Sequence, residues 1–389
     1  MFVNPQARQR VAPLRARPGE GWREQLGGWL FCLPALALLA LFLVIPIALA
    51  AWVSISNWDG IGSPLSSGVH SVGLANYKAL LTEPGLARTD LGESVRNNFY
   101  YVLFVVPIQT LLALVLAVVV SRKGLFARGF FRTAYYFPSV TSSVAIAIVF
   151  QFLFSGTGTL NAVLGFLGIH GPNWFSDPNG VIQNLLAAVG VHSGPSALVN
   201  HGLLGLSWWQ WLSGPSVAMC ALIALGVWTT TGTFMLIFLP ALYNISEEVE
   251  EAAQVDGASA WQQFWRITVP LVRPVTFLVL TLGLIGTWQV FDSVFLISQG
   301  NPAGTTLTPA FLAYTTSFGD QQWGQGAAIA FLLFGLIIAL VLLQRWLLGR
   351  RERRSERRAR RAQRRAPAPR MASQQAASQQ AGASARNSR

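Results

Sequence analysis

Six long apolar segments constrain the fold of this chain more than any other feature. Each is long enough, at about 20 residues or more, for a helix to cross the roughly 30 Å hydrocarbon core of a membrane. Backbone polar groups in lipid must be paired inside the segment itself, so helices are expected. Only 11% of the residues are charged, well below the roughly 25% of a soluble domain. The sequence therefore predicts an all-α polytopic membrane protein with six spans: Trp29–Val53, Phe99–Val120, Ala134–Phe154, Val217–Leu239, Val275–Ile297 and Ala327–Leu348.

Basic residues are concentrated on one side of this predicted topology. Of 28 Lys and Arg residues, 25 lie before the first span, in the loops after the second and fourth spans, or from Arg345 onward at the end of the last span. The loops 156–216 and 298–326 contain none. Because Lys and Arg are retained on the cytoplasmic side, both termini are expected in the cytoplasm. The first span is too long for a signal-peptide core, so we expect it to remain uncleaved.

The two ends of the chain are predicted to lie outside the six-span domain, which covers 29–349. Residues 1–28 form a cytoplasmic segment, and residues 350–389 form a basic, disordered cytoplasmic tail. The net charge of +12 comes mainly from Arg345–Arg370. Such a run beside a span is typical of contact with anionic lipid headgroups, so nucleic acid is not an expected partner. Cys32 and Cys220 form no Cys-x-x-Cys pair, so no metal site is expected.

A polar, acidic segment interrupts the hydropathy between the fourth and fifth spans, at about 242–273. Ser246 can cap a helix whose first turn holds Glu247 and Glu248, at the positive end of the helix dipole. Gly257 permits a turn, and a second short helix is expected before Pro270. An interfacial helix without a partner is the competing interpretation. Such helices carry Lys and Arg on their polar face, whereas an acidic face with small alanines favours a protein cleft.

This segment resembles the cytoplasmic "EAA" signature loop of binding-protein-dependent ABC importer permeases. The matching residues are Glu251-Ala252-Ala253, Asp256-Gly257-Ala258, Phe264, Ile267 and Pro270-Leu271. The resemblance implies docking onto a separate ATPase subunit, with Glu251 pairing with a basic group and Gly257 forming the bend. The coupling residues that it implies are Glu247, Glu250, Glu251, Ala252, Ala253, Asp256, Gly257, Phe264 and Pro270.

A second resemblance covers Phe291–Thr306, which looks like the segment after the fifth span in carbohydrate-uptake permeases of the maltose and glycerol-phosphate type. This chain has Gly300-Asn301-Pro302 where that family usually has Gly-Gly-Pro. The resemblance implies a type I ABC importer permease in the bacterial inner membrane. Its implied partners are a second permease subunit in a heterodimer, two ATPase subunits that bind ATP and Mg, and an extracytoplasmic sugar-binding protein.

The chain has no phosphate loop of the Gly-Lys-Ser/Thr type, so no cofactor is expected on it and ATP hydrolysis is assigned to separate chains. It also lacks Gly-x-Ser-x-Gly and His-Glu-x-x-His motifs, which disfavours a membrane enzyme. Two further functions stay open. One is that of a permease for a related solute such as glycerol phosphate. The second is that of an ion-coupled secondary transporter, for which only Asp292 is a candidate ion site and no inverted repeat is evident.

An external loop carries an apparent insertion. Trp174-Phe-Ser-Asp-Pro178 and Trp211-Leu-Ser-Gly-Pro215 are near copies, 37 residues apart. Only the second copy has the family's usual distance to Trp228. The resemblance therefore implies an insertion at about 174–210, whose role is either a contact with the binding protein or plain loop elaboration.

Polar and aromatic side chains inside spans are costly, and they suggest a functional site. Aromatic rings, hydroxyls and a carboxylate fit an uncharged sugar, although each ring could instead serve packing and each threonine could bond its own helix backbone. We expect a buried Asp292 carboxylate to need a partner. The candidate substrate residues are Trp228, Thr230, Thr233, Thr287, Trp288, Phe291 and Asp292.

Overall fold

The computed structural model describes residues 20–122, 124, 126–191 and 193–365. Almost all regular structure in this part of the chain is helical. The exception is a hairpin of two short strands, β1 (Gly202–Leu203) and β2 (Leu206–Ser207), which pair antiparallel. Contacts divide the chain into two compact units, 1–88 with 312–331 and 89–311 with 332–389.

The first unit contains the first apolar helix and the start of the last one. Its elements are α1 (Glu20–Leu39), the π-helical turn η1 (Ala40–Val44), α2 (Ile45–Ser54), α3 (Ala75–Leu81) and the π-helical turn η4 (Thr315–Gly319). The rings of Trp58 and Trp323 lie 5.4 Å apart. Gly60 has φ +89, and a Cβ on it would lie 2.0 Å from the Trp323 indole nitrogen. Only glycine therefore fits between this loop and the Trp323 ring.

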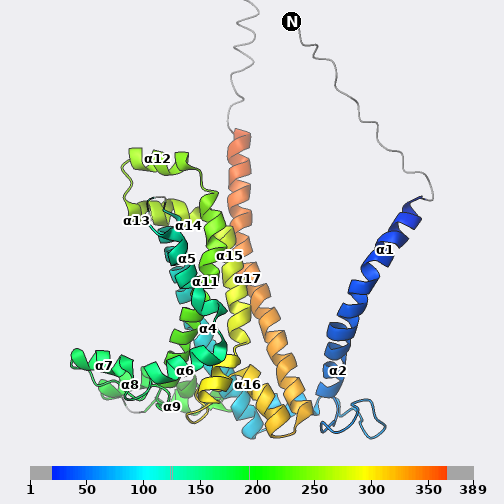
Figure 1. The fold of residues 1–389 in the computed structure, drawn as a ribbon. Coiled ribbons are helices and arrows are strands. Elements are labelled where there is room, and N and C mark those ends of the chain that lie inside the picture. Colours follow the sequence, from blue (N-terminus) through cyan, green and yellow to red (C-terminus); the bar gives the residue numbers. More distant parts are fainter. Residues whose placement is uncertain (1–19, 123, 125, 192, 366–389) are drawn as a thin grey trace, which may run out of the picture. The chain divides into compact units, whose positions relative to one another are not determined.

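The second unit is a helix bundle. Its long helices are α4 (Leu86–Ser121, whose first residues belong to the first unit), α11 (Val217–Tyr243) and α15 (Arg273–Trp288), with α5 (Arg128–Val140) and α6 (Ser143–Leu153) beside them (Figure 1). Val120, Met235, Phe238 and Val279 form part of one buried core between α4, α11 and α15. Gly232 permits close packing of α5 on α11, since a Cβ there would lie 2.1 Å from the carbonyl oxygen of Tyr135.

The expected spans are partly straight and partly bent. Four apolar helices are long enough to cross a membrane: Leu26–Ser54, Leu86–Ser121, Val217–Tyr243 and Trp323–Leu347. Two bent helix pairs raise the number to six if each pair is one span. The all-α membrane architecture is therefore confirmed.

The third and fifth spans differ from the single helices that were expected. In the third, α5 and α6 meet at 96°. In the fifth, α15 ends at Trp288 and the chain continues through an irregular stretch into the π-helical turn η3 (Val294–Ser298). Irregular backbone at membrane depth is tolerated where it lines a cavity, and both breaks do so. The short helix α16 (Pro309–Tyr314) follows.

The last helix is longer than its apolar segment. α17 extends over Trp323–Arg365, so residues 350–365 are helical and not disordered as expected. The Arg, Glu, Ala and Gln residues of this stretch have high helix propensity. Residues 366–389 and the first 19 residues of the expected N-terminal segment lie outside the described residues.

The expected insertion begins and ends at neighbouring positions in the structure. Gly180 and Ser216 form an antiparallel bridge, and the Val181 amide donates to the Pro215 carbonyl at 2.9 Å. The chain just after the first near-copy thus pairs with the chain at the end of the second, and the residues between these two points leave the bundle and return at one place. The whole external region, 156–216, contains α7 (Thr159–Phe166) before the insertion, followed by α8 (Val181–Ala188), α9 (Ser196–Val199), the β1–β2 hairpin and α10 (Trp208–Trp211).

Candidate functional site

The acidic segment forms the helix–turn–helix that the sequence predicts. It consists of α12 (Glu247–Val255), α13 (Ala260–Gln263), the π-helical turn η2 (Phe264–Thr268) and α14 (Val269–Leu271). Ser246 occupies the N-cap position of α12 with extended backbone, but its side chain makes no capping hydrogen bond. Glu247, Glu248 and Glu250 lie in the first turn, where the helix dipole favours negative charge.

Gly257 provides the turn between the two helices. It has φ +74, a left-handed conformation that glycine adopts without a steric penalty. The Ala258 amide donates to the Ala253 carbonyl at 2.9 Å, and the Gly257 amide to the Gln254 carbonyl at 3.0 Å. These two bonds form a Schellman motif that ends α12. Ser259 then caps α13 through a reciprocal capping box with Gln262. Residues 247–271 therefore form an elbow whose geometry is fixed on both sides of the turn.

The elbow is attached to the bundle mainly through its second half. Phe264 packs against the core that contains Phe238 and Val272. Pro270 is partly buried within α14, and the chain bends before α15. The apolar side of α12 is largely uncovered in this chain, because only Ala253 is buried while Val249 and Ala252 are exposed. The remaining coupling residues are exposed as well: Glu247, Glu250, Glu251, Asp256 and Gly257.

A cavity of about 470 Å³ lies in the second unit between α4, α5, α6, α11 and α15. It is bordered by the break between α5 and α6 and by the irregular stretch after α15. Five of the seven expected substrate residues line it: Thr230, Thr233, Thr287, Phe291 and Asp292. Of the described residues that line it, Asp292 alone has a charged side chain, and none is Lys or Arg.

Two side chains connect three helices at this cavity. The Thr230 hydroxyl of α11 donates a hydrogen bond to the side-chain oxygen of Gln109 on α4. Gln109 is fully buried, and its Nε2 lies over Gly283 of α15, where a Cβ would approach to 2.6 Å. Within the described chain, this Nε2 has no hydrogen-bond partner. The absence of a side chain at Gly283 therefore leaves space for a buried amide on the cavity wall.

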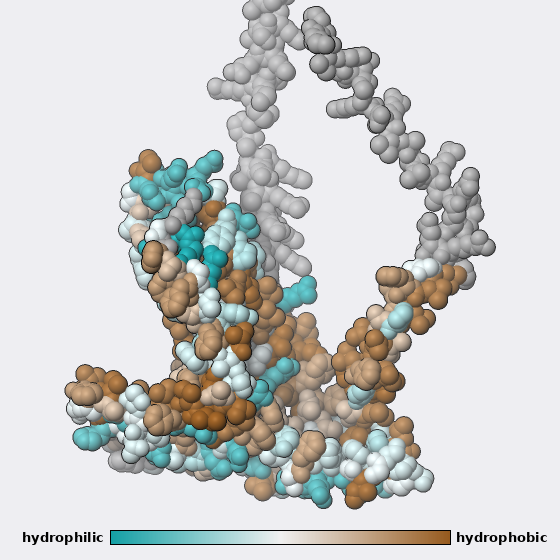
Figure 2. All heavy atoms as spheres, viewed as in Figure 1, coloured by the Kyte–Doolittle hydropathy of each residue, from teal (hydrophilic) through white to brown (hydrophobic). Residues whose placement is uncertain are grey.

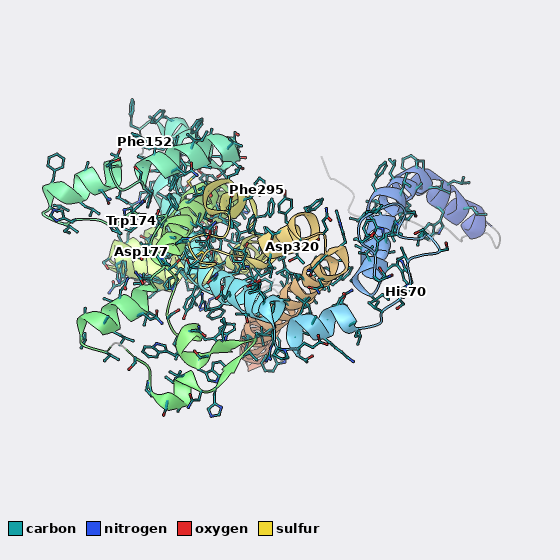
Figure 3. The ribbon with its side chains drawn as sticks, turned by 90° about the horizontal axis from the view of Figure 1, so that it is seen from below. His70, Phe152, Trp174, Asp177, Phe295 and Asp320 are labelled. Carbon is teal, nitrogen blue, oxygen red and sulfur yellow. The ribbon has the colours of Figure 1, made fainter. Side chains whose placement is uncertain are left out.

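The residues at the end of α15 have different environments. The Thr287 hydroxyl donates to the Gly283 carbonyl at 2.7 Å, so local backbone bonding accounts for this threonine. Phe291 stacks on Phe295 with ring centroids 5.3 Å apart, and Phe295 is labelled in Figure 3. Asp292 is exposed at the cavity, and the buried carboxylate that we expected is therefore not observed.

Two expected substrate residues lie away from the cavity. Trp228 is 46% exposed and packs on Phe150 of α6, with ring centroids 5.4 Å apart. Trp288 is buried with Val102, Val106 and Ile337 on the other side of α15. Neither indole lines the cavity. Their neighbours in the sequence line it, but a helix turns about 100° per residue, so adjacent residues lie on different faces.

The structure adds polar residues that the sequence analysis did not select. Gln109 was detectable, because an amide in the middle of an apolar span is costly and suggests function. Others lie at the helix breaks and depend on bends that the sequence did not predict. The additional polar residues that line the cavity are Tyr101, Gln109, Ser139, Thr141, Ser143, Thr229, Gln289 and Ser293.

Known proteins resemble this chain over most of its length. The lactose transport system permease protein LacF of Rhizobium radiobacter is 28% identical over 85% of this chain and 95% of its own. A probable ABC transporter permease of Pyrococcus horikoshii is 31% identical over 80% of this chain and 92% of its own. The arabinooligosaccharides transport system permease protein AraP of Bacillus subtilis is 28% identical over 85% and 92%.

Solved structures agree in fold. A bacterial alginate ABC transporter, in complex with an alginate pentasaccharide-bound periplasmic protein, contains a chain that matches with a TM-score of 0.60. The match covers 85% of this chain and 96% of that one, at 19% identity. The family described as "Binding-protein-dependent transport system inner membrane component" matches residues 109–353, which include the elbow and every cavity-lining residue except Tyr101. The chain is a transport subunit and not an enzyme, and it belongs to this family of inner membrane components of binding-protein-dependent transport systems.

Proposed function

We propose that this permease imports an uncharged sugar or oligosaccharide, delivered by a solute-binding protein and driven by ATP hydrolysis on separate subunits. The cavity carries the proposal. It presents hydroxyls and amides from Thr230, Thr233 and Gln109, together with the Phe291 ring. Hydroxyl and amide groups can exchange hydrogen bonds with sugar hydroxyls, and an aromatic ring can pack on a sugar face. The names of the relatives, among them lactose and arabinooligosaccharide permeases, support the same substrate class.

The charge of the cavity disfavours an anionic substrate. A phosphate or uronate would enter beside Asp292 with no Lys or Arg among the described lining residues. Like charges repel, and a partly desolvated anion needs a cation or several donors. Glycerol phosphate is therefore the weaker candidate. The ion-coupled carrier is also weaker, because the family is that of binding-protein-dependent transport.

In the proposed mechanism, the elbow transmits motion from an ATPase. Glu250 and Glu251 of α12 would pair with basic groups in the ATPase cleft, and Gly257 would hold the angle between α12 and α13. Phe264, packed in the bundle core, would pass displacement to α11 and α15, which line the cavity. ATP and Mg would reside on two ATPase chains. A second permease subunit would complete the translocation pathway, and both termini would lie in the cytoplasm with the elbow.

Competition among sugars tests the substrate class. Uptake of a labelled neutral oligosaccharide by the reconstituted transporter should be inhibited by unlabelled neutral sugars and not by the corresponding uronates. Asp292→Asn should retain neutral-sugar transport and relax the exclusion of uronates, with Asp320→Asn as a control outside the cavity. Preferred uptake of an acidic sugar by the unaltered protein would refute an uncharged substrate.

A further inference from the structure

The external region 156–216 has an unusual composition. It contains one charged residue, Asp177, and four of the chain's 14 tryptophans. Its helices α7 and α8 lie crosswise to α11, at the end of the second unit opposite α12 (Figure 1). Tryptophan is enriched where membrane proteins meet the interface between lipid and water. A nearly charge-free, tryptophan-rich region beside the spans is therefore compatible with that interface.

Both crosswise helices expose an apolar face. On α7 and the residue after it, Val163, Phe166 and Leu167 are 52%, 90% and 71% exposed. On α8 and the residue after it, Leu185 and Val189 are 64% and 82% exposed, and Ile182 lies one turn before Leu185. Residues three, four or seven positions apart share one helix face. Figure 2 shows apolar side chains on the side of these helices turned toward the level of the spans, with polar ones on the opposite side.

These helices are held against the bundle and are not a free loop. The Asn161 side chain of α7 donates to the Pro172 carbonyl at 2.9 Å and accepts from the Trp174 indole at 2.9 Å. Trp174 and Asp177 are labelled in Figure 3. The segment after α8 is anchored on α4, where the Tyr100 hydroxyl donates to the Trp211 carbonyl at 2.6 Å. The apolar faces therefore have a defined position relative to the spans of this unit.

We propose that α7 and α8 rest on the membrane, with their apolar faces in the boundary between headgroups and acyl chains of the leaflet opposite α12. The helix that precedes α7, α6, also exposes apolar side chains, among them Phe152 at 69%. A face that met a soluble protein only during docking would remain in water for the rest of the cycle, and large exposed apolar patches are rare on soluble surfaces. Lipid covers such a face permanently. The region 156–216 has no Lys or Arg, so binding would rest on buried apolar area alone and would not need anionic lipid, whose attraction is what basic residues add in other interfacial helices.

Fluorescence quenching in bilayers tests this proposal. In a Cys32→Ser, Cys220→Ser background, Phe166→Cys and Leu185→Cys would each carry an environment-sensitive dye, with Asn184→Cys as the polar control on α8. The assembled transporter would be placed in nanodiscs that contain phosphatidylcholine brominated on its acyl chains. Dyes at 166 and 185 should be quenched by the brominated lipid roughly threefold more than the dye at 184, because an interfacial helix immerses only one face. Aqueous iodide should give the reverse order.

Two outcomes would overturn the proposal. One is equal quenching by iodide at all three positions with none by the brominated lipid, which would place both faces in water. The second is iodide accessibility at 166 and 185 that disappears when the solute-binding protein is added, which would assign the surface to a protein partner. Two labelled positions on separate helices keep the test valid if one variant fails to assemble.

Discussion

Replacing Trp288 by alanine should destabilise the bundle and should not change substrate recognition directly. The indole is 3% exposed and packs with Val102 and Val106 of α4 and with Ile337 of α17. Its backbone carbonyl accepts a hydrogen bond from the Asn98 side chain at 3.0 Å, which a substitution leaves in place. Neither the Trp288 indole nor the side chains of Val102, Val106 and Ile337 line the cavity. The substitution therefore removes volume from a packed site between helices.

The magnitude follows from the size of the cavity that would be left. An aromatic side chain buries about 150–250 Å², and an unrelaxed cavity costs about 20 cal/mol per Å² of its surface. The product is about 3–5 kcal/mol of unfolding free energy, within the usual range for Trp→Ala. Trp288→Phe keeps most of the volume and should cost about 1–2 kcal/mol. The Trp288 Nε1 has no hydrogen-bond partner in the described part of the chain, so phenylalanine removes no bond.

Thermal unfolding of the purified permease in detergent, followed with a thiol-reactive dye, measures this effect. The melting temperature should fall in the order wild type, Trp288→Phe, Trp288→Ala. The matched variant is Thr233→Val, which changes a cavity hydroxyl and should alter the KM of uptake with little change in melting temperature. An unchanged melting temperature for Trp288→Ala together with a raised KM would refute this reasoning and would indicate that Trp288 contacts the substrate.

Two further predictions test separate parts of the structure. Gly257→Pro should lower the ATPase activity that the loaded binding protein stimulates by roughly tenfold or more, because proline fixes φ near −65° and Gly257 requires +74. Gly257→Ala adds about 1–2 kcal/mol of strain and should retain most of this activity. Equal ATPase activity of the two variants would contradict a fixed bend. Gly232→Ala should lower the melting temperature by forcing α5 from α11 at a cost of about 1–3 kcal/mol. In the control Gly286→Ala, the added Cβ has no atom within 4 Å, so the melting temperature should not fall. An equal fall in melting temperature for the two variants would contradict close packing at Gly232.

The sequence predicted the architecture and the elbow because both have local signals. Apolar length marks the spans, and the cap position at Ser246, the acidic first turn and Gly257 mark a helix–turn–helix without reference to the rest of the fold. The cap position is confirmed in backbone, although the Ser246 side chain makes no capping bond. The elbow's role in coupling remains a prediction. The near-copies that suggested an insertion lie just before the two sides of its base, which are paired at Gly180 and Ser216.

The cavity was only partly predictable. Thr230, Thr233, Thr287, Phe291 and Asp292 were selected because they are polar or aromatic residues in spans, and they do line one cavity. That criterion does not give the direction of a side chain, so it also selected Trp228 and Trp288. An indole in a membrane helix can line a cavity, face lipid or fill a packing gap, and only the position of the neighbouring helices decides which.

Long-range geometry explains the rest. The bends between α5 and α6 and after Trp288 bring Thr141, Ser143 and Gln289 to the cavity. Pro138, near the end of α5, is a local signal for the first bend that the sequence analysis did not use, and no local motif marked the second. The contact of Gln109 with Thr230 joins residues 121 positions apart. Such a contact depends on the packing of α4 on α11, which hydropathy does not specify. The helical extension to Arg365 shows that a basic composition rich in helix formers need not mean disorder.

ATP-dependent uptake in proteoliposomes tests the central claim most directly. The assembled transporter would be reconstituted with the elbow inside, ATP and Mg in the lumen, and the loaded solute-binding protein outside. The account predicts accumulation of a labelled neutral oligosaccharide that needs lumenal ATP, stops with vanadate and is lost in Glu251→Arg. Accumulation driven by a proton or sodium gradient without ATP, or full-rate import by Glu251→Arg, would contradict it.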